Sequence, residues 1–180
     1  MPVTTPLPVR SRWQTPEIAR RYAGDEGHAR WRSPRRARRD GQLIERALRR
    51  FASEADMASV LDVPCGTGRL APLLSTKSER YVGIDVSAAM IERARSEGPG
   101  SHETPGLHAV ADAATLPFAD RSFGTVIACR LLHHIVDDAE LRQIVAELVR
   151  VSSGLVVASF WNARSWQARR PGKRRDADGR

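Results

Sequence analysis

The chain has 180 residues, of which 41% are hydrophobic, and it carries a formal net charge of +8 at neutral pH. This length corresponds to one domain and is sufficient to bury a hydrophobic core. No apolar run approaches the roughly 20 residues that a membrane-spanning helix requires. The first dozen residues have prolines and arginines where a signal peptide would have its apolar segment, so we expect a cytoplasmic protein with no membrane span.

The net charge is distributed unevenly along the chain. Residues 1–50 carry a net charge of +8, residues 51–160 carry −5 and residues 161–180 carry +5. Basic ends could contact nucleic acid or an anionic membrane surface. Almost all of the basic residues are arginines, which could equally reflect a compositional bias, so we do not expect a nucleic-acid partner.

The chain has two cysteines, Cys65 and Cys129, and each follows an apolar run that is typical of a buried strand. We therefore expect two buried thiols in a reducing compartment and no disulfide. This cysteine usage agrees with a cytoplasmic location.

The amino-terminal third contains two predicted helices. The Thr-Pro-Glu sequence at 15–17 provides an N-cap and a first-turn proline, and predicts a short helix to about residue 22. Residues 24–39 are charged and aperiodic, whereas residues 41–53 have apolar side chains at helical spacing and predict an amphipathic helix. The expected organisation is a disordered segment at 1–12, a folded domain at 13–160 and a basic tail at 161–180.

Residues 60–70, with the sequence VLDVPCGTGRL, predict a strand, a tight turn and the start of a helix. Apolar residues around Asp62 indicate a buried strand, and a proline and two glycines then force a turn before a helix that begins at about Arg69. Glycines let the main chain approach a ligand that a Cβ atom would exclude, and the helix start directs free N–H groups at that ligand. We therefore expect a ligand site at this loop.

After the loop, strands and helices alternate, with connections long enough for right-handed crossovers. This pattern predicts an open, doubly wound α/β fold whose parallel sheet is covered on both faces. Further strands are predicted at 80–85, 107–111, 125–129 and 154–160. One helix is expected to be capped by Ser87, to bury Met90, Ile91 and Ala94, and to end at residues 98–100. A second is opened by Asp137 and Asp138, with Leu141, Ile144, Val145 and Leu148 toward the core.

Three of the predicted strands end in carboxylates, at Asp62, Asp85 and Asp112. The carboxyl ends of parallel strands meet at one edge of a sheet, where such folds bind ligands. Asp85 lies 19 residues after Gly66, close to the spacing at which an acid accepts hydrogen bonds from two ribose hydroxyls. Asp85 and Asp112 could each be ordinary turn residues. An unpaired Asp62 in an apolar strand would cost several kcal/mol, so this carboxylate needs a partner.

Gly66, Gly68 and Ala71 also satisfy the G-x-G-x-x-G/A spacing of dinucleotide-binding loops, which alone is a weak signal. Asp62 argues against a dinucleotide because its carboxylate would face a pyrophosphate that carries two negative charges. A ligand that is cationic at this end removes the conflict. S-adenosylmethionine has this property, because it carries a sulfonium and an amino group and has no phosphate.

The loop resembles the first motif of class I S-adenosylmethionine-dependent methyltransferases, D-x-G-x-G-x-G, with Pro64 in place of the first glycine. Residues 83–86 (GIDV) look like the second motif of this family, and residues 111–123 look like its adenine-side loop. Residues 131–135 (LLHHI) resemble the segment after strand four in the small-molecule methyltransferases that include the ubiquinone and menaquinone biosynthesis enzymes. The resemblance covers roughly residues 40–160.

The resemblance implies a role for the residues at the strand ends. Asp62, Gly66 and Gly68 would surround the methionine end of S-adenosylmethionine, Asp85 would hold the ribose, and Asp112 with the Ala113 main chain would hold the adenine. No metal is implied, and no catalytic side chain is assigned, because placing the acceptor in line with the methyl group can supply most of the rate. The expected cofactor-binding residues are Asp62, Pro64, Cys65, Gly66, Thr67, Gly68, Asp85, Val86, Asp112, Ala113 and Cys129.

Some residues near the expected site have two interpretations. His133 and His134 could act as a general base, although histidines after such a strand more often hold the loop through hydrogen bonds. Trp13 and Tyr22 could form a lid over the cofactor or simply pack as part of a terminal helix. Gly124 stands where the family usually has Asp, a departure that we expect to affect loop geometry.

By the resemblance, we expect methyl transfer from S-adenosylmethionine to a small-molecule acceptor. A non-catalytic domain that keeps the cofactor site, and an RNA methyltransferase that uses the basic ends, are the alternatives. The sequence after the fourth strand is Cys-Arg-Leu-Leu, and no N-P-P-Y-type motif for a nucleobase acceptor is present.

Sheets of this family have seven strands, and only five can be drawn from this chain. After Asn162 no β-branched run or hairpin signal is present. The fifth strand, with Leu155, Val156 and Val157, would then be an open apolar edge. We therefore expect either a truncated gene product or a domain that needs a partner or a second copy at that edge, and we expect cofactor binding to survive more readily than turnover.

Overall fold

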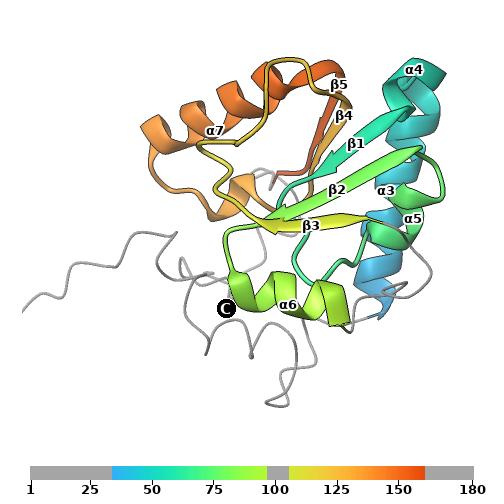
Figure 1. The fold of residues 1–180 in the computed structure, drawn as a ribbon, viewed down its shortest axis with the longest axis horizontal. Coiled ribbons are helices and arrows are strands. Elements are labelled where there is room, and N and C mark those ends of the chain that lie inside the picture. The colour runs from blue at the N-terminus through green and yellow to red at the C-terminus, as the bar shows by residue number, and fades with distance from the viewer. Residues whose placement is uncertain (1–33, 97–105, 161–180) are drawn as a thin grey trace, which may run out of the picture.

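The computed structural model describes residues 34–96 and 106–160. These residues form a sheet of five parallel strands in the order β3-β2-β1-β4-β5, flanked by helices (Figure 1). The predicted open α/β fold is confirmed. The elements in chain order are α3 (Pro34–Phe51), α4 (Glu54–Met57), β1 (Ser59–Asp62), α5 (Ala71–Ser75), β2 (Arg80–Asp85), α6 (Ala88–Ser96), β3 (Leu107–Val110), β4 (Phe123–Ala128), the short 3₁₀ helix η1 (Leu132–His134), α7 (Asp138–Val151) and β5 (Ser152–Ala158).

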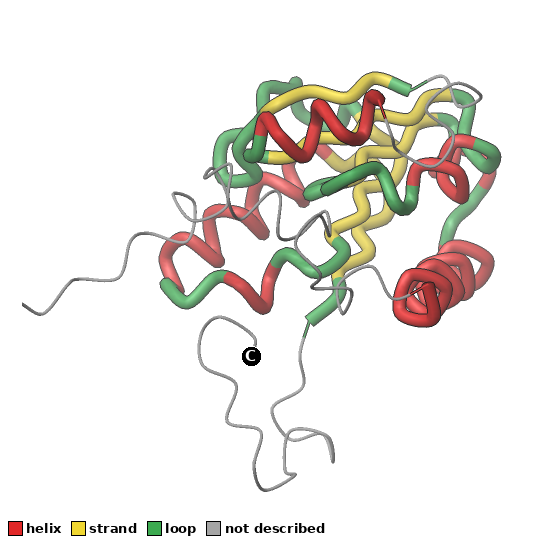
Figure 2. The backbone as a smooth tube through the Cα atoms, turned by 90° about the horizontal axis from the view of Figure 1, so that it is seen from below, coloured by secondary structure: helices red, strands yellow, loops and turns green. Residues whose placement is uncertain are grey.

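The strand order reverses at β1, which lies at the centre of the sheet between β2 and β4. Figure 2 shows the strands, in yellow, with helices, in red, around them. Asp62 is in register with Gly83 of β2 and with Ile127 of β4. The chain segments that follow β1, β2 and β4 therefore leave the sheet at the same side, where the strands have their carboxyl ends, and lie close together. Ligands of doubly wound sheets bind at such a switch point, so the topology places the candidate site here.

Successive side chains of the strands lie on opposite faces of the sheet and form two separate hydrophobic layers, as expected of a sheet that is buried on both faces. On one face Leu61 and Val126 pack with Ile144 and Leu148 of α7. On the opposite face Val60, Tyr81 and Ile127 pack with residues of α3 and α5, including Ile44, Leu48, Ala71 and Leu74. Figure 1 shows α7 on one side of the sheet and α3 and α5 on the other.

Several predicted element boundaries differ from the structure. Helix α3 begins at Pro34, seven residues before the expected start at residue 41, and so includes part of the charged segment that sequence periodicity left unassigned. Helix α5 begins at Ala71 and not at about Arg69, because residues 66–70, which include both glycines of the loop, form turns. Strand β4 starts at Phe123 and not at residue 125. The predicted core position Val145 is wrong: this side chain is exposed, and Val151 is buried in α7.

The predicted start of α6 is confirmed, since the Ser87 side chain accepts a hydrogen bond from the Met90 N–H over 3.4 Å. Asp137 is the N-cap of α7, and its carboxylate accepts a hydrogen bond from the Glu140 N–H over 2.7 Å. The expected helix at 15–22, the helix end at 98–100 and the segments 1–12 and 161–180 lie outside the described residues. The domain boundaries therefore stay predictions.

Gly124 lies in β4 at the end of the sheet opposite the glycine loop. Its N–H donates to Ser59 Oγ over 3.0 Å, and the neighbouring Thr125 hydroxyl donates to the Asp56 carbonyl over 2.9 Å. A Cβ atom at Gly124 would lie 2.5 Å from that carbonyl oxygen. The departure from the family's Asp therefore concerns the packing of α4 on β4, at the end of the sheet away from the glycine loop.

Strand β5 is an edge strand in the described part of the chain and pairs only with β4 there. Its apolar residues Leu155, Val156 and Val157 are half-buried between the two helical layers. Within residues 34–96 and 106–160, no helix is both long and apolar enough to cross a membrane.

Candidate cofactor-binding site

Two hydrogen bonds to neighbouring strands hold the chain that leaves β1. The Val63 N–H donates to the Ile127 carbonyl over 2.9 Å, and the Cys65 N–H donates to the Ile84 carbonyl over 2.8 Å. Gly66 and Gly68 then have φ angles of 55° and 75°. These angles lie in the left-handed region that side chains with a Cβ atom rarely adopt, so glycine is required for this turn. The Val63–Pro64 peptide bond is cis.

Asp62 ends β1 directly beneath this loop, and its side chain is fully buried. Its Oδ2 atom accepts a hydrogen bond from the Tyr81 hydroxyl over 3.2 Å. Its Oδ1 atom is buried and has no hydrogen-bond partner among the described residues. Burial raises the pKa of Asp62 to about 7, and the hydrogen bond from Tyr81 opposes that rise. Asp62 therefore provides a buried carboxylate oxygen that is available to a cationic ligand group.

Asp85 ends β2 and holds the glycine loop in place. Its Oδ2 atom accepts a hydrogen bond from the Gly66 N–H over 3.0 Å, and its Oδ1 atom accepts one from the Ser87 N–H over 2.9 Å. Burial raises the pKa of this carboxyl to about 6, and the main-chain N–H donors partly offset the effect. The two carboxylate oxygens have about four lone-pair sites between them, so the group can accept a further hydrogen bond from a ligand. Asp85 is thus both a loop-positioning residue and a candidate ribose acceptor.

Asp112 follows β3 and is partly exposed. Its Oδ1 atom accepts a hydrogen bond from the Ala114 N–H over 2.9 Å, which is the local turn geometry that the simpler interpretation of this residue predicted. A turn role and a ligand role are compatible here, because a carboxylate can accept several hydrogen bonds and this one orients the main chain at Ala113.

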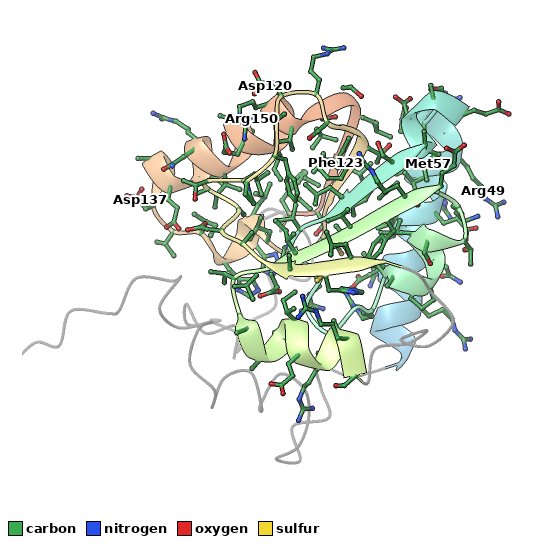
Figure 3. All side chains as sticks on the ribbon, viewed as in Figure 1. Arg49, Met57, Asp120, Phe123, Asp137 and Arg150 are labelled. Atoms are coloured by element: carbon green, nitrogen blue, oxygen red, sulfur yellow. The ribbon has the colours of Figure 1, made fainter. Side chains whose placement is uncertain are left out.

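A network on α7 holds the segment after Asp112 against the domain. Arg150 donates to the carbonyls of Leu116 and Phe118, over 3.0 Å and 2.8 Å, and pairs with Asp120 over 2.8 Å. Glu147 pairs with Arg150 and accepts a hydrogen bond from the Leu116 N–H over 2.7 Å. Figure 3 shows Arg150 and Asp120 next to each other at one end of α7, with Asp137 at the other end. The network therefore restrains the segment between β3 and β4 from the side of α7.

The end of β4 contributes a thiol and two histidines. Cys129 and Cys65 are buried and free, as expected. Burial raises the pKa of each thiol, so neither is a thiolate at neutral pH. His133 and His134 lie in η1, with ring centroids 4.1 Å apart, directly after the strand.

A comparison with protein families identifies residues 60–153 as a methyltransferase domain, which is more than half of the chain. An O-methyltransferase, cnsE, of Penicillium expansum is 33% identical over 122 residues, or 67% of this chain and 44% of the relative. A 27-O-demethylrifamycin SV methyltransferase of Amycolatopsis mediterranei is 31% identical over 103 residues, or 56% of this chain and 38% of the relative. The chain belongs to the class I S-adenosylmethionine-dependent methyltransferases. It spans less than half the length of these two relatives.

The solved structures agree with this family. An S-adenosylmethionine-dependent methyltransferase of Methanosarcina mazei superposes with a TM-score of 0.52 at 26% identity, covering 59% of this chain and 52% of that one. The expected family membership, cofactor and Rossmann-like fold are confirmed.

The residues present fit S-adenosylmethionine. The buried Oδ1 atom of Asp62 needs a donor, and the loop beside it is built from glycines with positive φ. The methyltransferase topology also brings all the predicted strand-end residues to one edge. Within the described residues, no cluster of three or more His, Cys, Asp or Glu side chains could hold a metal ion.

Sequence reasoning missed three residues at or under this edge, Tyr81, His108 and Asp40. Tyr81 supports Asp62, and the His108 ring lies 5.7 Å from the Tyr81 ring. Asp40 of α3 pairs with Arg69 over 3.0 Å and lies 3.7 Å from Arg130. Tyr81 could have been found as a partner of Asp62, because it lies 19 residues later on the predicted next strand. Asp40 had no such signal, because it lies in a segment whose helix was not predicted.

Proposed function

We propose that this domain binds S-adenosylmethionine at the carboxyl ends of β1, β2 and β3 and transfers its methyl group to a small-molecule acceptor. The buried carboxylate of Asp62 beside the glycine loop is the observation that carries the proposal. The names of the Penicillium and Amycolatopsis relatives both indicate O-methyl transfer, which supports a hydroxyl as the acceptor group. The buried free thiols support a reducing compartment such as the cytoplasm.

Each residue of the site has a proposed role. Asp62 accepts hydrogen bonds from the ammonium group at the methionine end, and the turn formed by Pro64, Cys65, Gly66, Thr67 and Gly68 lies against that end. Asp85 accepts from the ribose hydroxyls, with Val86 beside it. Asp112 and the Ala113 main chain contact the adenine, and Cys129 closes the site from the end of β4.

The chemistry of transfer places few demands on the protein. When bound, S-adenosylmethionine supplies an electrophilic methyl group on a positively charged sulfur. The chain has to hold the acceptor in line with that group and keep water away, and such placement can account for a large part of the rate. His133 or His134 could accept the acceptor's proton, since both follow β4 directly, although their position also suits a role in holding the loop.

Calorimetric titration of the whole chain tests this proposal. We expect S-adenosylmethionine and S-adenosylhomocysteine to bind and NAD not to bind. Asp85→Ala should weaken S-adenosylhomocysteine binding by about 1.5–3 kcal/mol, the contribution of hydrogen bonds to a charged acceptor. Glu54→Gln, at the opposite end of the sheet, is the matched control and should bind normally.

Because Asp85 also holds the loop, the ribose role needs its own measurement. The 2′-deoxy analogue of S-adenosylhomocysteine lacks one of the two hydroxyls, so Asp85→Ala should weaken its binding less than that of the parent compound. Equal losses for the two ligands would contradict the ribose assignment. Preference for NAD over S-adenosylmethionine would overturn the proposal as a whole.

Two alternatives remain distinguishable by experiment. Cofactor binding without turnover of any hydroxylated acceptor would favour a non-catalytic domain. Nanomolar RNA binding that weakens steeply as salt rises would favour an RNA methyltransferase, because each neutralised phosphate releases counterions.

The last part of the proposal concerns β5, which pairs on one side only among residues 34–96 and 106–160. Edge strands of this kind favour coverage by a further strand, from a partner or a second copy of this chain. Size-exclusion chromatography with light scattering distinguishes the two. A stable monomer that methylates an acceptor would show that five strands suffice.

A further inference from the structure

Helix α3 presents a row of basic side chains on its exposed face. Its sequence contains seven arginines and two acids, so the helix carries a net charge of +5. Ile44 and Leu48 are buried against the sheet, whereas Arg39, Arg46 and Arg50 are exposed. Because these three arginines are seven and four positions apart, they form one row along the helix, the arginine row, on the face away from the buried side chains. Figure 1 shows α3 on the side of the sheet away from α7.

The two acids of α3 pair with basic side chains outside the arginine row. Asp40 pairs with Arg69 over 3.0 Å. Glu45 pairs with Arg49 over 2.8 Å and with Lys77 over 3.2 Å. The Arg49 side chain is 74% exposed, and Figure 3 shows it at the outer side of the domain. Among the described residues, the acids of the helix therefore do not neutralise the arginine row.

The chain after α3 has the opposite charge. Residues 51–160 carry a net charge of −5. A negatively charged surface would attract α3 and repel the remainder of the domain, so long-range electrostatics would turn α3 toward such a surface. The charge distribution is thus complementary to an anionic partner on the side of α3.

Two large apolar side chains are exposed on the same helix. Leu43 is 52% exposed and lies within the arginine row, four residues after Arg39 and three before Arg46. Phe51 ends the helix and is 68% exposed, with the guanidinium carbon of Arg50 5.9 Å from the centre of its ring. Helices that bind in the plane of a membrane surface combine basic residues with exposed leucine and phenylalanine in this way. A nucleic acid would be held through its phosphates by the arginines and would gain little from Leu43.

We propose that the exposed face of α3 is a docking site for an anionic lipid surface. The arginine row binds the lipid head groups, and Leu43 and Phe51 enter the boundary between head groups and acyl chains. The helix has 18 residues and is about 27 Å long, so the row can lie along a flat surface. The pair of Asp40 with Arg69, directly after the glycine loop, places such a surface beside the carboxyl edge of the sheet. Docking of this kind goes beyond methyl transfer and does not require a bound cofactor.

Co-sedimentation of the whole chain with vesicles tests this proposal. We expect binding to vesicles of phosphatidylcholine and phosphatidylserine, and no binding to vesicles of phosphatidylcholine alone. The affinity should fall as salt rises, because ions screen the attraction between arginines and head groups. Arg46→Gln and Arg50→Gln should each weaken binding about fivefold. Arg142→Gln, the same charge change at an exposed position of α7, is the matched control and should have little effect.

Leu43→Gln separates a lipid surface from a nucleic acid. The substitution keeps every charge of the helix and should weaken vesicle binding several-fold, because it removes an apolar side chain from the lipid boundary. Val149→Gln is the matched control, since Val149 is a 60% exposed apolar residue of α7. Thermal unfolding of each variant verifies that it is folded before its vesicle binding is compared.

The outcomes divide clearly. Vesicle binding that depends on the arginines but not on Leu43 would support docking through the head groups alone. Absence of binding to anionic vesicles, or binding that is insensitive to Arg46→Gln and Arg50→Gln, would overturn the proposal. RNA binding that weakens in Arg46→Gln and is unchanged in Leu43→Gln, without vesicle binding, would assign the face to a nucleic acid and overturn it as well. Titration with S-adenosylmethionine tests the proposed function separately from all of these outcomes.

Discussion

The hydroxyl of Tyr81 donates a hydrogen bond to one oxygen of Asp62 over 3.2 Å, while the other oxygen of that fully buried carboxyl has no partner among the described residues. Tyr81 and Asp62 come from neighbouring strands, and the bond fixes the orientation of the carboxyl beneath the glycine loop. One satisfied oxygen and one unsatisfied oxygen make Asp62 costly to ionise before a ligand binds. The predictions about pH follow from this pair.

The stability of the ligand-free protein should depend on the ionisation of Asp62. Burial raises its pKa from 3.8 in the unfolded chain to about 7 in the folded protein. The folded state thus holds this proton more tightly, so the contribution to stability is complete below about pH 4 and is lost as pH rises through 7. Asp85, with a pKa of about 6, acts in the same direction.

Urea unfolding between pH 4.5 and 8 measures this effect in the unmodified protein and in Asp62→Asn. We expect the free energy of unfolding of the variant, relative to the unmodified protein, to rise by about 3 kcal/mol across this range. The difference between the two proteins removes the contribution of surface carboxylates. A difference that is constant with pH would contradict the raised pKa.

Cofactor binding should release a proton near neutral pH. A cationic group beside Asp62 stabilises the carboxylate and lowers its pKa, so ligand affinity should increase as pH rises from 6 to 7.5 and then level off. Calorimetry at pH 6.5 in phosphate and in imidazole, which have different ionisation enthalpies, measures the released proton directly. In Asp62→Asn the proton release assigned to this residue should disappear; identical release in both proteins would assign the proton elsewhere.

Gly124→Ala should destabilise the domain by about 1–3 kcal/mol, the typical cost of forcing an extra methyl group into a packed site. The new Cβ atom would lie 2.5 Å from the Asp56 carbonyl oxygen, and main chain cannot move aside as a side chain can. Gly41→Ala is the matched control. Its Cβ atom would have its nearest contact at 3.9 Å, with Leu73, and alanine favours the helix by roughly 0.5–1 kcal/mol. Thermal unfolding of the two variants should shift in opposite directions.

Arg150→Gln should loosen the loop that follows β3. Its guanidinium group holds the carbonyls of Leu116 and Phe118, so the loss should increase hydrogen exchange at the Leu116 amide and lower the melting temperature. Arg142→Gln, an exposed change on the same helix, should affect neither measurement. Unchanged exchange at Leu116 in Arg150→Gln would show that Glu147 alone holds the loop.

Much of the fold followed from local patterns. The apolar runs and turn residues predicted all five strands to within two residues at their starts and ends, and the caps at Ser87 and Asp137 were found from residue type alone. The start of α3 was missed because its first turns are charged and have no apolar face that periodicity could detect. Val145 was assigned to the core because helical spacing defines a face but not its width, and the position of α7 on the sheet decides which residues at the margin are covered.

The sequence by itself determined the alternation of strands and helices, the glycine loop and the carboxylates at the strand ends, because these depend on residue type and short-range spacing. Only the tertiary structure decided which side chains meet across those ends. Asp40 and Arg69 are 29 residues apart, and Arg130 is farther along the chain, yet the order β3-β2-β1-β4-β5 brings all three to one edge. Contacts of this kind depend on which strands are neighbours, and no local pattern of charge encodes that order.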